Sequence, residues 1–127
     1  MERIQLTEDL SFSRIIHGLW RLNEWEMTKE ERLELIEACL ALGITTFDHA
    51  DIYGDYTNER LFGEALALKP ELRDRMEIVT KTGIKMKGNH FSDQSLSFYD
   101  TTKEHIIKQV NRSLQELGVE YVDTLLI

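Results

Sequence analysis

The sequence predicts an α/β protein in which parallel strands form a sheet with helices packed against it. Three observations indicate this class. Apolar, β-branched runs alternate along the chain with segments whose apolar residues recur at helical spacing. Helix-start signals and glycine stops separate these segments, and no linker or low-complexity stretch interrupts them. Repeated strand–helix–strand units imply parallel pairing, because each helix returns the chain to the same end of the sheet.

The strands are expected where β-branched and apolar residues cluster between turn signals. A small hairpin is expected within residues 4–11, before the first strand of the sheet. Strands of the sheet are then expected over residues 14–18, 44–48, 77–81 and 121–127. The polar, glycine-bearing stretch 83–100 has no clear period and predicts a long loop, and such loops are usually functional or mobile.

Three helices are expected between these strands. The first begins at the capping box Thr28–Glu31 and runs to about Leu42, where Gly43 supplies a left-handed stop. The second covers residues 58–68 and is ended by Pro70, whose ring is incompatible with a helix interior. The third begins at a second capping box, 101–104, and stops at Gly118.

Composition predicts one globular domain over residues 1–127. The chain is 42% hydrophobic and 30% charged, and its net charge of −8 argues against nucleic acid or an anionic membrane as partner. The only cysteine, Cys39, lies in an apolar helical pattern and cannot form an internal disulfide, which suits a reducing compartment. The N-terminus lacks the apolar core of a signal peptide, and no apolar run is long enough to span a membrane. A cytoplasmic location is therefore expected.

The last predicted strand ends with the chain itself. An apolar strand at a terminus leaves an uncovered edge, so we expect this chain to be a fragment or one piece of a larger assembly. The order of elements fits either an open, doubly wound sheet or part of an eight-stranded barrel, which typically needs about 250 residues.

The stretch FDHADIYG, residues 47–54, carries two carboxylates, an imidazole and a phenol. Side chains alternate along a strand, so Asp48 lies on the opposite face from His49. A metal site needs converging ligands, and this pattern therefore favours structural roles for His49 and Asp51.

Asp48 and Lys81 lie at the carboxyl ends of neighbouring parallel strands, which is the end where α/β proteins build their sites. Gly54 shapes a loop that would fold Tyr53 back over this end. A neighbouring ammonium favours the phenolate and so lowers the pKa of a phenol. The three residues therefore predict a relay that delivers a proton to a developing alkoxide. In the alternative, Asp48 and Lys81 only pair and Tyr53 caps a helix.

The chain resembles the aldo-keto reductases, and its sequence is most similar to their bacterial predicted-oxidoreductase branch. The resemblance rests on five motifs taken together, from the first strand onward. They are Gly18-Leu19-Trp20; GITTFDHADIYG, residues 43–54; Asn58-Glu59 with Phe62-Gly63; Val79-Thr80-Lys81; and HIIKQVNRSLQELGVEYVDTLLI, residues 105–127.

The resemblance implies the N-terminal half, strands 1–4, of a (β/α)8 TIM barrel that uses NADPH to reduce aldehydes or ketones to alcohols. It implies Tyr53 as general acid, Lys81 as the group that assists it and Asp48 as the partner of Lys81. Gly18, Trp20 and Arg21, together with Asp48, would lie beside the nicotinamide ribose. The family's catalytic histidine would follow Ile127, and its phosphate-binding loops follow later strands, so this chain alone is expected to be inactive.

Two other functions remain open from the sequence. The chain could be a non-catalytic half-barrel module that forms a homodimer through its exposed strand edges. It could instead be a metal-dependent hydrolase on a barrel that uses Asp48 and Asp51. For the reductase, a small-molecule carbonyl compound is the expected substrate, and the sequence does not name it.

Overall fold

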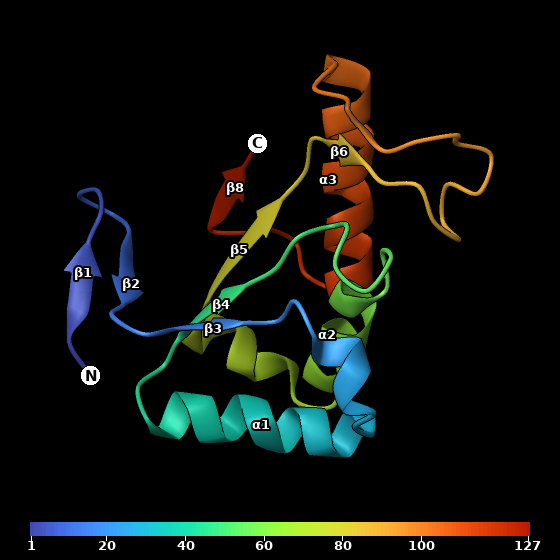
Figure 1. The fold of residues 1–127 in the computed structure, drawn as a ribbon. Coiled ribbons are helices and arrows are strands. Elements are labelled where there is room, and N and C mark those ends of the chain that lie inside the picture. The colour runs from blue at the N-terminus through green and yellow to red at the C-terminus, as the bar shows by residue number, and fades with distance from the viewer.

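The computed structural model describes residues 1–127 and places helices against one face of a four-stranded parallel sheet (Figure 1). The strands lie in the spatial order β3-β4-β5-β8, and each pairs in parallel with the next. This order is that of the first four strands of a (β/α)8 barrel. The sheet strands are β3 (Ile16–Gly18), β4 (Thr46–Asp48), β5 (Glu77–Lys81) and β8 (Thr124–Leu126).

The remaining elements connect and cover this sheet. The helices are α1 (Lys29–Ala41), α2 (Asn58–Leu66) and α3 (Lys103–Leu117), with short 3-10 turns η1 (Leu22–Trp25) and η2 (Pro70–Arg75). An antiparallel hairpin of β1 (Arg3–Gln5) and β2 (Ser11–Ser13) precedes the sheet, and a second one joins β6 (Ile84–Lys85) to β7 (Phe98–Tyr99). None of the helices has the length and apolar character that a membrane span requires.

The predicted α/β class and the number and order of the sheet strands and main helices are confirmed. The third sheet strand has the predicted bounds, whereas the other three are shorter than expected because their flanking residues leave the hydrogen-bonded ladder. Thr28 caps α1 with both hydrogen bonds of the predicted box. The second box was wrong: Thr102, not Thr101, caps α3 by accepting a bond from the His105 amide at 3.3 Å.

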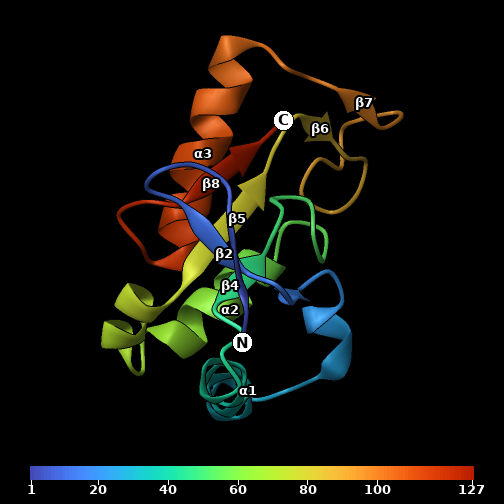
Figure 2. The same ribbon diagram turned by 90° about the vertical axis from the view of Figure 1, so that its left-hand side faces the viewer.

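The hydrophobic core lies between the sheet and the helices. Phe47 and Ile78 project from β4 and β5 and are fully buried, as is Leu117 at the end of α3. The Phe47 and Phe62 rings pack with their centroids 5.4 Å apart, which fixes α2 against β4. Cys39 is buried in this core, as its apolar pattern predicts. Figure 2 looks onto the opposite face of the sheet, with α2 and α3 behind the strands.

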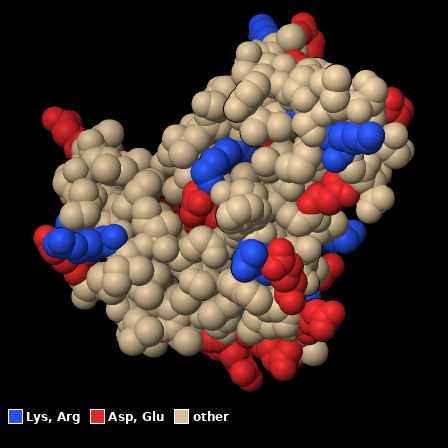
Figure 3. Space-filling view, in the orientation of Figure 1, with Lys and Arg blue, Asp and Glu red and all other residues tan.

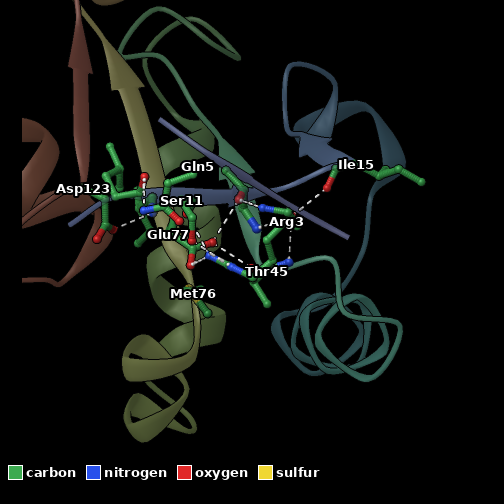
Figure 4. Close-up of polar contacts among 12 residues, drawn as sticks. Arg3, Gln5, Ser11, Ile15, Thr45, Met76, Glu77 and Asp123 are labelled. Atoms are coloured by element: carbon green, nitrogen blue, oxygen red, sulfur yellow. Dashed lines mark hydrogen bonds and ion pairs between the residues drawn. The ribbon is translucent and has the colours of Figure 1, made fainter. Parts of the chain in front are cut away.

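The N-terminal hairpin is fastened to the amino-terminal end of the sheet (Figure 4). Arg3 donates to Thr45 and forms an ion pair with Glu77 at 2.5 Å. The second Glu77 oxygen accepts bonds from Thr45 and Thr46 at 2.7 and 2.9 Å. These contacts cover the amino-terminal end of the sheet and leave its carboxyl-terminal end as the open one.

A buried polar layer joins β5 to α2 and α3 behind the sheet. The Glu59 carboxylate accepts bonds from Thr80 at 3.0 Å and from Ser113 at 2.9 Å. Burial raises the pKa of Glu59 from 4.5 to about 7, although both bonds oppose the shift. The folded protein therefore holds Glu59 partly protonated near neutral pH.

Glu59 is expected to make the protein less stable as the pH rises. A carboxyl whose pKa is higher in the folded state stabilises that state below its unfolded pKa, and this contribution is lost as the pH rises through the folded pKa. Here the loss runs from pH 4.5 to about 7 and amounts to roughly 3 kcal/mol. We expect Glu59→Gln, which cannot ionise, to lack it when urea unfolding is measured across that range.

The wild type must be compared with Glu59→Gln because His49 also makes the stability of the protein depend on pH. Burial, with a smaller effect of the Lys81 charge, lowers the pKa of His49 from 6.5 to about 3, so stability falls as the pH drops through this range. This slope opposes that of Glu59 in the wild-type protein and is present in both proteins. Identical pH dependence of the wild type and Glu59→Gln would contradict the prediction.

Candidate active site

The segments at the carboxyl ends of β4 and β5 bring the side chains of Asp48 and Tyr53 together around the Lys81 ammonium. Lys81 Nζ lies 2.7 Å from Asp48 Oδ1, 2.9 Å from the His49 carbonyl oxygen and 3.0 Å from Tyr53 Oη. All three are hydrogen-bond distances. The structure therefore brings together the three residues that the sequence predicts as a relay.

A tight loop after β4 returns Tyr53 to the sheet. Gly54, Asp55 and Tyr56 have φ values of 63°, 50° and 68°, so three consecutive residues adopt the left-handed conformation. A Cβ on Gly54 would lie 2.0 Å from Asn58 Oδ1, which requires glycine there for space as well as for conformation. We refer to residues 54–56 as the left-handed turn.

Tyr56 and Asn58 fasten this loop to its surroundings. The Tyr56 hydroxyl donates to the Ile84 carbonyl at 3.0 Å and accepts from the Met86 amide at 2.9 Å. The Asn58 amide donates to the carbonyl oxygens of Leu19 and Trp20, which follow β3. Sequence reasoning gave neither residue a role of its own, because their partners lie far away along the chain.

The hydrogen-bond inventory identifies the group that can release a proton. A lysine ammonium has three N–H donors, and Asp48, His49 and Tyr53 accept all three. The Tyr53 oxygen is the acceptor in its bond with Lys81, so its own O–H is directed elsewhere. Burial would lower the pKa of Lys81, but the hydrogen bonds to Asp48 and Tyr53 raise it overall. Lys81 therefore stays charged, and the phenol is the free donor.

A cavity of about 190 Å³ adjoins these groups. Tyr53, Lys81, Thr82 and Ile84 contribute to its lining, together with residues 50–52. Figure 3 shows a hollow between the N-terminal hairpin and the rest of the molecule, in which acidic and basic side chains meet. The cavity thus offers space next to the phenol.

His49 and Asp51 lie on the other side of the strand end. The His49 ring is fully buried with its centroid 4.5 Å from that of Phe62, on the helix side of the sheet. Asp51 Oδ2 accepts bonds from Thr82 and Gln109 at 2.7 and 3.0 Å, whereas Asp48 binds Lys81. Asp48 and Asp51 do not converge, so the geometry does not support the metal-dependent hydrolase as an alternative.

The residues expected beside a cofactor lie at the adjoining strand end. Gly18 closes β3 and is paired with Asp48 of β4. Trp20 is 70% exposed, so it is not the packing residue that a tryptophan in an apolar run usually is. Arg21 is also exposed and forms an ion pair with Glu24 at 3.4 Å.

Comparison with known proteins identifies a family and several relatives. Residues 14–127 match the family model "Aldo/keto reductase family". The chain is 57% identical over its whole length to "Uncharacterized oxidoreductase YcsN" of Bacillus subtilis, covering 42% of that protein. It is 47% identical over its whole length to "6-dehydroglucose reductase" of Agrobacterium fabrum, covering 43%. The chain thus spans less than half the length of these curated relatives.

Solved structures of this family share the fold. The holo form of the aldo-keto reductase AKR11C1 from Bacillus halodurans superposes with a TM-score of 0.78 at 28% identity. The superposition covers 99% of this chain and 40% of that one. The glycerol dehydrogenase AKR11B4 from Gluconobacter oxydans gives a TM-score of 0.76 at 29% identity, covering 98% of this chain and 38% of that one.

Proposed function

The chain belongs to the aldo/keto reductase family, and from this premise we propose that it supplies the proton-donating part of a carbonyl-reducing active site. The proposed substrates are aldehydes or ketones, which the enzyme would reduce to alcohols. The observation that carries the proposal is the saturation of the Lys81 ammonium, which leaves the Tyr53 O–H as the free donor beside the cavity.

Tyr53 acts as the general acid. Reduction of a carbonyl carbon places negative charge on its oxygen, and a positioned O–H that gives up its proton there lowers the barrier. The phenolate that remains accepts a charge-assisted bond from Lys81, which is already in place at 3.0 Å. Asp48 holds Lys81 and balances its charge at 2.7 Å. The proton source and its stabilising charge are therefore arranged before the reaction begins.

The ends of β3 and β4 fit the nicotinamide ribose end of a dinucleotide cofactor. A Cβ on Gly18 would meet no atom within 4 Å, so the strand end is open. Asp48 uses Oδ1 for Lys81 and keeps Oδ2 as an acceptor for a ribose hydroxyl. We assign Gly18, Trp20, Arg21 and Asp48 to this role, with NADPH as the cofactor. When bound, the reduced nicotinamide supplies the hydride.

We propose that activity requires the whole barrel and that residues 1–127 form its N-terminal half. The support is the four-stranded sheet together with the coverage of less than half of each relative. The chain carries net negative charge, which favours small molecules rather than nucleic acid or an anionic membrane as partners. The redox state expected of its buried cysteine favours the cytoplasm.

A chimera tests the proposal. The purified chain is compared with a protein in which it is joined to the part of the Bacillus subtilis relative that it does not cover. We expect the chimera to oxidise NADPH in the presence of 4-nitrobenzaldehyde and the chain alone to leave NADPH unchanged. A folded but inactive chimera, or sustained NADPH oxidation by the chain alone, would contradict the proposal.

Self-association is a second candidate function, favoured by the two sheet edges. The outer strands β3 and β8 each have only one neighbour in the sheet. Ile16 and Leu126 on these strands are 44% and 47% exposed. Edge strands with exposed apolar residues pair readily with further strands. Light scattering that gives the mass of a dimer would support this candidate, and a monomer would exclude it.

A further inference from the structure

The relay depends on the register between two separate segments of the chain. Asp48 and Tyr53 belong to the segment that leaves β4, whereas Lys81 ends β5. A hydrogen bond weakens steeply beyond its normal range, so the distance of 3.0 Å from Tyr53 Oη to Lys81 Nζ requires the two segments to be held together.

Backbone bonds hold the segments together only as far as Asp51. The His49 amide donates to the Val79 carbonyl at 2.8 Å, and the Asp51 amide donates to the Lys81 carbonyl at 3.0 Å. Beyond Asp51 the chain leaves the sheet and enters the left-handed turn. Asp51 is thus the last residue attached to β5 before Tyr53, two positions later.

The Asp51 side chain reinforces this last attachment. Its Oδ2 atom accepts from the Thr82 hydroxyl, next to Lys81 on the chain, and from the Gln109 amide of α3. The residue is only 2% exposed. Burial raises the pKa of Asp51, and the bonds from Gln109 and Thr82 oppose that shift. Its carboxyl group is therefore held in the interior by one partner just after β5 and one on α3.

We infer that Asp51 is a positioning residue for the site: by accepting bonds from Thr82 and Gln109 it fixes the register that brings Tyr53 onto Lys81. The inference rests on the proposed function, because the register matters only if Tyr53 and Lys81 act together. The required property is an acceptor oxygen rather than a charge. Asn, which retains one such oxygen, is expected to replace Asp51, whereas Ala is not.

Glu59 provides a matched control in the same polar layer. Like Asp51 it is a buried carboxyl group with two side-chain donors, here Thr80 on β5 and Ser113 on α3. It lies in the first turn of α2 rather than in the segment that carries Tyr53, and its partner Thr80 precedes Lys81. Glu59→Ala removes the same kind of contact without touching the last attachment before the turn.

The test observes Tyr53 directly in the full chain by NMR with ring-labelled tyrosine. Tyr53→Phe assigns its signal among the four tyrosines, and Lys81→Met marks the signal of Tyr53 without its ammonium partner. We expect Asp51→Ala to move the Tyr53 signal most of the way to the Lys81→Met position. Asp51→Asn and Glu59→Ala should leave it at the wild-type position.

Two results would overturn the inference. One is an unmoved Tyr53 signal in Asp51→Ala, and the other is an equal movement in Glu59→Ala. If Asp51→Ala does not fold, Thr82→Val, which removes a single donor, is judged by the same criteria. The measurement needs neither substrate nor cofactor. An inactive chimera would therefore refute the proposed function, while the NMR result would still decide whether Asp51 positions Tyr53.

Discussion

Tyr53→Phe is expected to lower kcat for carbonyl reduction in the chimera by about 10²-fold to 10⁴-fold. The substitution removes the only O–H at the site that no internal bond requires, while the ring that packs beside Lys81 remains. The binding of substrate and cofactor should change little, so KM is expected to stay near its wild-type value. Steady-state kinetics with a reactive aldehyde measures both constants.

Tyr121→Phe is the matched control for this variant. Tyr121 lies before β8, its ring packs against Arg73 at 4.1 Å, and its hydroxyl makes no hydrogen bond within the protein. The Tyr121→Phe variant is expected to retain the wild-type kcat. Should Tyr53→Phe retain it as well, another group must supply the proton and the assignment of the general acid would be wrong.

Gly63→Ala is expected to destabilise the protein by about 3 kcal/mol or more. Gly63 lies inside α2 where this helix meets the end of α3. A Cβ there would be 2.1 Å from the Glu116 carbonyl oxygen and 2.9 Å from Leu117 Cα, both of them backbone atoms. Helix propensity alone predicts the opposite sign, since alanine is favoured over glycine by about 1 kcal/mol.

Comparing the urea unfolding of Gly63→Ala with that of Gly18→Ala isolates the effect of the steric clash at Gly63. A Cβ on Gly18 meets nothing within 4 Å, so its replacement should change the free energy of unfolding by less than about 0.5 kcal/mol. Stabilisation by Gly63→Ala would show that the two helices can separate, and would contradict the close packing described for α2 and α3.

The helix ends were predictable because local chemistry determines them. The Thr28 side chain at the start of α1 and the left-handed Gly118 at the end of α3 act within one turn of the chain, and both lie where the sequence predicts, whereas the N-terminal cap of α3 falls one residue later than predicted. The ends of the sheet strands other than β5 were not, because residues such as Ile44 and Tyr121 have strand-like character but find no partner in the ladder. Ladder pairing depends on the neighbouring strand, which a local pattern does not contain.

The contacts of the candidate site were likewise predictable only in part. Alternation along the strand separates Asp48 from His49, and parallel pairing places Lys81 at the same edge, so the relay followed from the sequence. The bonds from Gln109 to Asp51 and from Tyr56 to Ile84 did not, because they join residues far apart in the chain. The loop at Gly54 was predicted, but the left-handed conformation of Asp55 and Tyr56 was missed, since these residues are not glycines.

The left-handed turn also determines when Tyr53 becomes ordered. Non-glycine residues in this conformation cost of order 1 kcal/mol each, and here the surrounding contacts of Tyr56 and Asn58 maintain them. Folding of the chain provides the free energy for this conformation, so Tyr53 is already ordered before any ligand binds. If the proposed reductase function holds, we therefore expect carbonyl substrates to meet a rigid Tyr53, and selectivity among them to arise from the walls of the cavity.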